Sequence, residues 1–144
     1  MSGSGHSTVE PNADSCVVLL KVFDTRIMIP GDIGSEQEGE IVAYWGRRQL
    51  KTDILIAAHH GSKTSTSATW LHRASPSYVV YSTARQNRFG HPHPDVTERV
   101  MQLGFEPFNT ANSGTITFTI DARGIPHNAE MRTDMSPYWL QLER

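Results

Sequence analysis

The sequence predicts a layered α/β domain built on a mixed sheet. Blocks of apolar, β-branched residues alternate with helix-like segments through the middle of the chain. A hairpin-like run of strand segments follows the last helix, so the sheet is expected to combine parallel and antiparallel pairs. The chain has 144 residues, 38% of them hydrophobic and 19% charged, which suits one domain with a core of its own.

A hairpin is expected to open the domain. The first strand, over 15–23, carries the continuous apolar block Cys16-Val-Val-Leu-Leu20, which is typical of a strand covered on both faces. Cys16 is therefore expected to be buried as a small hydrophobic residue. Asp24-Thr25 forms a tight connection to a second strand over 26–30, which ends at Pro30 because proline cannot continue a ladder.

Helices are expected over 35–50, 68–73 and 94–104. The first begins with capping-box spacing, Ser35 to Glu38, and directs an apolar face toward the core. That face consists of Ile41, Val42, Trp45 and Leu50. Pro94 suits the first position of the last helix, and Gly104 suits its C-terminal cap. The remaining strands are expected over 53–58, 78–82, 105–109, 114–121 and 130–133.

Composition limits the possible functions. The net charge of -2 gives no global attraction to nucleic acid, so any DNA contact has to come from a local patch. A single cysteine rules out an internal disulfide. The longest apolar run is far shorter than the roughly 20 residues that span a bilayer, and residues 1–6 lack signal-peptide features. We expect a flexible leader over 1–11, a domain over 12–135 and a tail over 136–144, all soluble.

Metal-competent side chains follow two of the apolar strands. Asp32 comes after Pro-Gly at the end of one strand, and His59 and His60 end another. Ligands gather outside the carboxyl ends of strands in open α/β sheets, and a carboxylate can bridge two cations. As successive strand residues, the two histidines are expected to diverge, with one facing a metal and the other free to transfer a proton. The alternative is that Asp32 is a turn residue and the histidines are structural.

Two polar loops complete the set of candidates. Lys63, Thr64 and Ser65 form either a phosphate cradle or a solvated loop that caps the next helix. In the second loop, Arg85 and Arg88 suit a phosphodiester and Phe89 suits a stacked base. The prolines around His91 and His93 display these histidines for substrate contact, or else make them structural caps. Asn87 belongs to the same substrate-facing loop.

Four ordered motifs resemble a known family. They are Asn12-x-Asp14-Ser15-Cys16 with its apolar block, Pro30-Gly31-Asp32-Ile33, Ala58-His59-His60-Gly61-Ser62-Lys63-Thr64-Ser65 and Asn87-Arg88-Phe89-Gly90-His91-Pro92-His93-Pro94. In this order they are similar to the C-terminal metallo-β-lactamase-like domain of ComEC proteins. The resemblance covers residues from about 12 to 135.

The resemblance implies an αββα sandwich with a divalent metal site, zinc or manganese. ComEC-type proteins are polytopic proteins of the bacterial inner membrane that admit one DNA strand, and this domain is thought to degrade the other. Asp32 then resembles the bridging aspartate and His60 the next metal ligand, with His59 as the catalytic, substrate-facing histidine. The parent channel, single-stranded DNA and a periplasmic location of the domain follow as expectations.

One motif of that family is missing. The sequence contains no His-x-His/Asp-x-Asp-His, so the chain resembles only the C-terminal half of the sandwich. Asp32 and one histidine fall short of a catalytic site, and weak metal binding with little hydrolysis is expected. The uncovered face is expected to favour a homodimer. The alternatives are a non-catalytic module that binds single-stranded DNA, or a hydrolase of the same fold acting on phosphocholine or small phosphodiesters.

Overall fold

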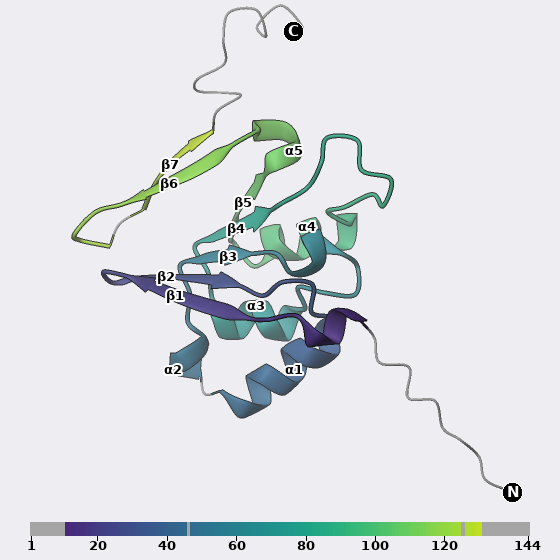
Figure 1. The fold of residues 1–144 in the computed structure, drawn as a ribbon, viewed down its shortest axis with the longest axis horizontal. Coiled ribbons are helices and arrows are strands. Elements are labelled where there is room, and N and C mark those ends of the chain that lie inside the picture. The colour runs from purple at the N-terminus through teal and green to yellow at the C-terminus, as the bar shows by residue number, and fades with distance from the viewer. Residues whose placement is uncertain (1–10, 46, 125, 131–144) are drawn as a thin grey trace, which may run out of the picture.

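The fold combines a five-stranded mixed sheet with a separate two-stranded sheet (Figure 1). The computed structural model describes residues 11–45, 47–124 and 126–130. The large sheet contains β1 (Val18–Val22), β2 (Thr25–Ile29), β3 (Ile54–Ile56), β4 (Tyr78–Tyr81) and β5 (Glu106–Asn109), paired in that order. The β1–β2 pair is antiparallel, whereas β2, β3, β4 and β5 pair in parallel, so the predicted mixed α/β sheet is confirmed.

Helices connect β2 to β3, β3 to β4 and β4 to β5, and one further short helix follows β5. They are α1 (Ser35–Tyr44), α2 (Arg47–Leu50), α3 (Ala68–Ala74), α4 (Pro94–Gln102) and α5 (Thr110–Ser113), with 3-10 turns η1 (Pro11–Asp14) and η2 (Ala58–Gly61). Strand order follows chain order, and right-handed crossovers then place the connecting helices on one face of the sheet. The larger core cluster lies on that face. It joins strand residues such as Met28, Leu55 and Val79 to Trp70 and Leu71 of α3 and to Val96 and Val100 of α4.

The other face of the sheet is covered only in part. Residues that alternate with the first set, Ile54, Val80 and Phe108, form a second cluster with Ile116 and Phe118 of β6 (Ile116–Ile120). The strand β6 pairs antiparallel with β7 (Pro126–Glu130). Beyond this hairpin, β1 leaves Val18, Leu20 and Val22 at least one-third exposed, so the sheet presents an apolar face at its β1 edge.

Several sequence predictions for residues 15–50 are wrong. The strand expected to be covered on both faces is an edge strand whose five residues are all exposed, and Cys16 is exposed as well. The single helix expected over 35–50 ends at Tyr44, and Leu50 reaches the core through the short α2 instead. Trp45 follows the end of α1 and is exposed, with its ring against that of Tyr44.

The remaining predicted elements occur with shifted ends. The final strand was expected over 130–133 but β7 ends at Glu130, and the other residues of that prediction lie outside the described part of the chain. No sequence pattern predicted α5, a single turn that opens with the Asn109 side chain accepting the Ala111 N–H. Within the described residues, none of the helices is both long and apolar enough to cross a membrane.

Candidate functional site

The Gly31-Asp32 turn and the His59-His60 turn meet beyond the carboxyl ends of β2 and β3. These strands are parallel neighbours, so their ends lie at the same edge of the sheet. The His59 N–H donates to the Gly31 carbonyl at 3.0 Å, and the Asp32 N–H donates to Ser15 Oγ at 3.2 Å. These hydrogen bonds fix Asp32 against the histidine turn.

The sequence had suggested that the two histidines end a strand, but they do not. They lie in η2, where His59, His60 and Gly61 all have positive φ, at 46°, 57° and 78°. A left-handed conformation costs a non-glycine residue about 1–2 kcal/mol, so the turn stores strain that its neighbours must hold. The ring centroids of His59 and His60 are 6.4 Å apart, so the two rings do not point to opposite faces of a strand. Both lie at the edge of the sheet where Asp32 lies, and we call this edge the Asp32–His60 rim.

Asp32 and His60 form the central pair of this rim. His60 Nε2 lies 3.9 Å from Asp32 Oδ1, and both side chains are about half exposed. On its other side, His60 Nδ1 is 2.7 Å from the Ser82 carbonyl. A carbonyl only accepts, so Nδ1 carries the proton and the lone pair of a neutral ring lies on Nε2. A metal-binding histidine is usually oriented in this way, by a backbone carbonyl on its other nitrogen.

His91 packs beside the pair. Its ring centroid is 5.9 Å from that of His59, and burial, with further contributions from His59, His60 and His93, lowers its pKa. A lowered pKa keeps this ring neutral in the neutral pH range. No group of three or more His, Cys, Asp or Glu side chains in the described ranges is arranged to hold a metal ion. Asp32 and His60 therefore suit two positions of a metal site and leave at least one more to be supplied.

The predicted phosphate cradle is divided by the fold. Thr64 is exposed and lines a hollow of about 310 Å³ together with Asp32, His59 and the first residues of α1. Ser65 is buried, and its hydroxyl donates to the carbonyls of Ala58 and Ser62, so it serves the loop itself.

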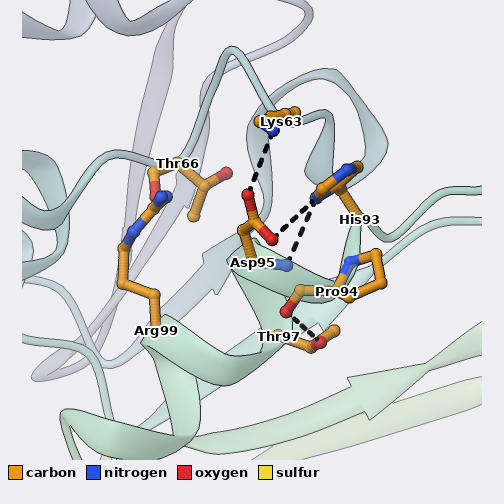
Figure 2. Close-up of polar contacts among 7 residues, drawn as sticks. All are labelled: Lys63, Thr66, His93, Pro94, Asp95, Thr97 and Arg99. Carbon is orange, nitrogen blue, oxygen red and sulfur yellow. Dashed lines mark hydrogen bonds and ion pairs between the residues drawn. The ribbon is translucent and has the colours of Figure 1, made fainter.

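Lys63 and His93 both contact Asp95 at the start of α4 (Figure 2). Lys63 Nζ is 3.4 Å from Asp95 Oδ2. His93 Nδ1 accepts the Asp95 N–H at 3.2 Å and so caps the helix. The His93 N–H in turn donates to the Gly61 carbonyl at 2.9 Å, which joins the second loop to the histidine turn.

The loop between β4 and α4 is closed by one side chain. Asn87 accepts the His91 N–H at 2.8 Å and donates to the His91 carbonyl at 2.6 Å, so its amide holds the loop shape. Arg85 and Arg88 are exposed on the outside of the loop, and the Arg88 guanidinium lies 4.8 Å from the centre of the Phe89 ring. The two arginines are thus displayed on a closed loop next to the Asp32–His60 rim.

A buried carboxylate that was not predicted as part of the site supports the loop that follows the histidine turn. Glu38 does not cap α1, because the Gly34 N–H donates to Gln37 Oε1 instead. Glu38 is buried, accepts the N–H groups of Thr66 and Ser67, and has a pKa raised by burial. From α4, Arg99 Nη1 donates to the Thr66 carbonyl at 2.8 Å. Helical spacing contained the signal, since residue 38 shares a face with Ile41 and Val42.

No family model matches the chain. It is 30% identical over 122 residues to Competence protein ComA of Neisseria gonorrhoeae, covering 85% of this chain and 18% of the relative. It is also 28% identical over 107 residues to ComE operon protein 3 of Bacillus subtilis, covering 74% and 14%. Its homologues include competence proteins.

A further homologue is named for recombination. Recombination protein 2 of Haemophilus influenzae is 32% identical over 133 residues, covering 91% of this chain and 16% of the relative. The chain thus spans less than a fifth of the length of each of these relatives. The similarity concerns one segment of a much longer protein in every case.

Proposed function

We propose that this chain forms part of a metal-dependent nuclease domain of a DNA-uptake protein, which degrades the strand that is not imported during transformation. The homology to competence proteins supports the process, and the Asp32–His60 pair supports the chemistry. The single observation that carries the proposal is the orientation of His60, with Nδ1 on the Ser82 carbonyl and Nε2 directed to Asp32. The resemblance to the metallo-β-lactamase-like domain of ComEC proteins agrees with this assignment.

The residues of the rim have separate roles in this proposal. A bound divalent ion, zinc or manganese, would polarise the phosphodiester and lower the pKa of a bound water. Asp32 and His60 would hold the ion, with the Ser82 carbonyl keeping the His60 ring in position. His59, whose ring lies 6.4 Å from that of His60, would exchange a proton with the substrate or leaving group. Since zinc catalysis uses at least three protein ligands, the others would come from outside the described residues, either in this chain, in the rest of a longer protein or in a second copy.

Divalent metal binding is expected to depend on both members of the pair. Asp32→Ala and His60→Ala should each weaken binding of Mn²⁺ or Zn²⁺ by at least about tenfold. Loss of a residue that only supports a metal ligand already lowers metal affinity by about that much, and loss of a ligand should cost no less. Isothermal titration calorimetry measures the affinity. Asp24→Ala and His72→Ala, which change exposed residues away from the rim, are the controls. Equal affinities in all four variants would contradict the assignment of the metal site.

A second candidate function is binding of single-stranded DNA without hydrolysis. The specific observation in its favour is that the described residues provide no complete metal-ligand group, whereas Arg85 and Arg88 are both exposed. Both candidate functions use phosphate contacts from the loop between β4 and α4 that carries Arg85 and Arg88, here called the arginine loop. Metal-dependent cleavage by the chain, lost in Asp32→Ala, separates them in favour of the nuclease.

The arginine loop is expected to set the salt dependence of DNA binding. In Arg85→Ala/Arg88→Ala, the slope of log K against log salt should fall by about 1.4, since each phosphate contact to a single strand contributes about 0.7. Fluorescence anisotropy of a labelled oligothymidylate at several salt concentrations gives the slope. Arg73→Ala/Arg123→Ala, a matched loss of charge at exposed positions outside the loop, should leave it unchanged. An unchanged slope in the first variant would remove the loop from the DNA-binding surface.

A further inference from the structure

A second recess lies directly beside the Asp32–His60 pair. It has a volume of about 230 Å³ and is lined by His60, Ala84, Phe89, His91 and the chain at Ser82–Thr83. Drug-sized ligands occupy pockets of about 300–1,000 Å³, so this smaller recess suits a single planar ring system. His60 lines it and also forms the central pair, which makes the recess continuous with the proposed metal rim.

The outer wall of the recess is an aromatic platform. Phe89 is 66% exposed, a large apolar surface to present to water. Its ring stacks on His91 at 19° between planes, with 5.9 Å between centroids, and the Arg88 guanidinium lies over the ring. The Asn87 side chain bonds to both the N–H and the carbonyl of His91, so the platform is formed before any ligand binds.

We propose that this recess binds one base of single-stranded DNA, stacked on Phe89, while an adjoining phosphate lies at the Asp32–His60 rim. The inference rests on the proposed function, because it takes the substrate to be a nucleic acid. Stacking on an exposed aromatic ring is the usual way that proteins bind bases of a single strand, and duplex bases are not free to stack in this way. Arg88 lies over the platform ring and Arg85 is exposed on the same loop, so both can supply positive charge to a polynucleotide backbone.

The chemistry of the recess also predicts weak sequence preference. Asn87 also lines the recess, but its amide already bonds to the Ala84 and His91 carbonyls, and the Thr83 hydroxyl donates to Asn109 Oδ1. No carboxylate is among the lining residues. Recognition therefore depends on the face of the base, which every base possesses, and one site accepts any of them.

An abasic oligonucleotide tests the stacking directly, because it keeps the phosphates and lacks the bases. In fluorescence anisotropy, Phe89→Ala should weaken binding of oligothymidylate about 5- to 150-fold, the usual effect of removing one stacking ring. Binding of an abasic strand of equal length should be the same in Phe89→Ala and in the unmodified chain. Phe89→Trp should restore affinity for oligothymidylate, and Met101→Ala, at another exposed apolar residue, should leave it unchanged.

Several results would overturn the inference. They are no loss of oligothymidylate affinity in Phe89→Ala, an equal loss on the abasic strand, or no measurable DNA binding by the unmodified chain. The proposed function is tested separately, because metal affinity of Asp32→Ala and His60→Ala does not involve a base. Normal metal binding by Phe89→Ala with unaltered DNA affinity would reject the base site and leave the metal assignment standing.

Discussion

Replacing Gly61 by alanine is expected to lower the free energy of unfolding by about 2–5 kcal/mol. Gly61 has φ of +78°, a left-handed conformation that costs other residues about 1–2 kcal/mol. A Cβ at this position would lie 2.8 Å from Tyr81 Cδ1 and 2.9 Å from Pro92 Cβ, and relief of such overpacking costs about 1–3 kcal/mol more. Urea unfolding monitored by circular dichroism measures the loss.

Gly104→Ala is the matched control for that variant. Gly104 has the same φ of +78°, but a Cβ added there would have no atom of another segment within 4 Å. This substitution should therefore cost only the backbone strain of about 1–2 kcal/mol. Equal losses in the two variants would mean that the contacts with Tyr81 and Pro92 do not select glycine at position 61. Metal affinity of Gly61→Ala should fall as well, because Gly61 follows His60 and bonds to His93.

Replacing Glu38 by alanine is expected to remove about 2–6 kcal/mol of stability. The carboxylate is the acceptor for the Thr66 and Ser67 N–H groups, and each buried donor left without a partner costs about 1–3 kcal/mol. Total stabilities are about 5–15 kcal/mol, so this change is large. Glu36→Ala, at an exposed position in the first turn of the same helix, should cost no more than about 1 kcal/mol.

The pH dependence of the free energy of unfolding separates the effect of Glu38 ionisation from the effect of the size and shape of its side chain. Burial raises the pKa of the folded state above the ordinary value of 4.5, so the folded protein holds this proton more tightly than the unfolded chain. The resulting stability is complete below pH 4.5 and is lost as the pH rises through the folded pKa. Relative to Glu38→Gln, which does not titrate, the unmodified protein should therefore lose stability over that window. A difference that stays constant with pH would show that burial does not control this group.

The order of strands and helices could be predicted from the sequence, because periodicity and turn residues are local. The parallel segments over 53–58, 78–82 and 105–109 all became neighbouring strands of one sheet. The apolar block from Cys16 to Leu20 was misread, since its composition does not reveal that, among the described strands, β1 pairs with β2 alone. The early end of α1 was missed for a similar reason, as Leu50 is buried but belongs to a separate turn.

The residues of the candidate site were also visible in the sequence, but their arrangement was not. Asp32 and His60 were expected together, and they lie 3.9 Å apart. The left-handed turn that brings them there depends on Gly61 fitting between Tyr81 and Pro92, which are distant in sequence. Lys63 and His93 were expected to face a substrate, and their shared contact with Asp95 depends on the docking of two loops.

By itself, the sequence determined the class of the fold and the chemical types gathered at the ends of its strands. It did so because apolar periodicity, prolines and glycines act over a few residues at a time. Only the tertiary structure decided which of those polar groups lie together, which form hydrogen bonds within the loops and which remain exposed. That decision depends on contacts between segments remote in sequence: Glu38 with Thr66 and Ser67, His60 with Ser82, and His93 with Gly61. Local preferences contain no information about such contacts, because they are fixed by packing of the whole domain.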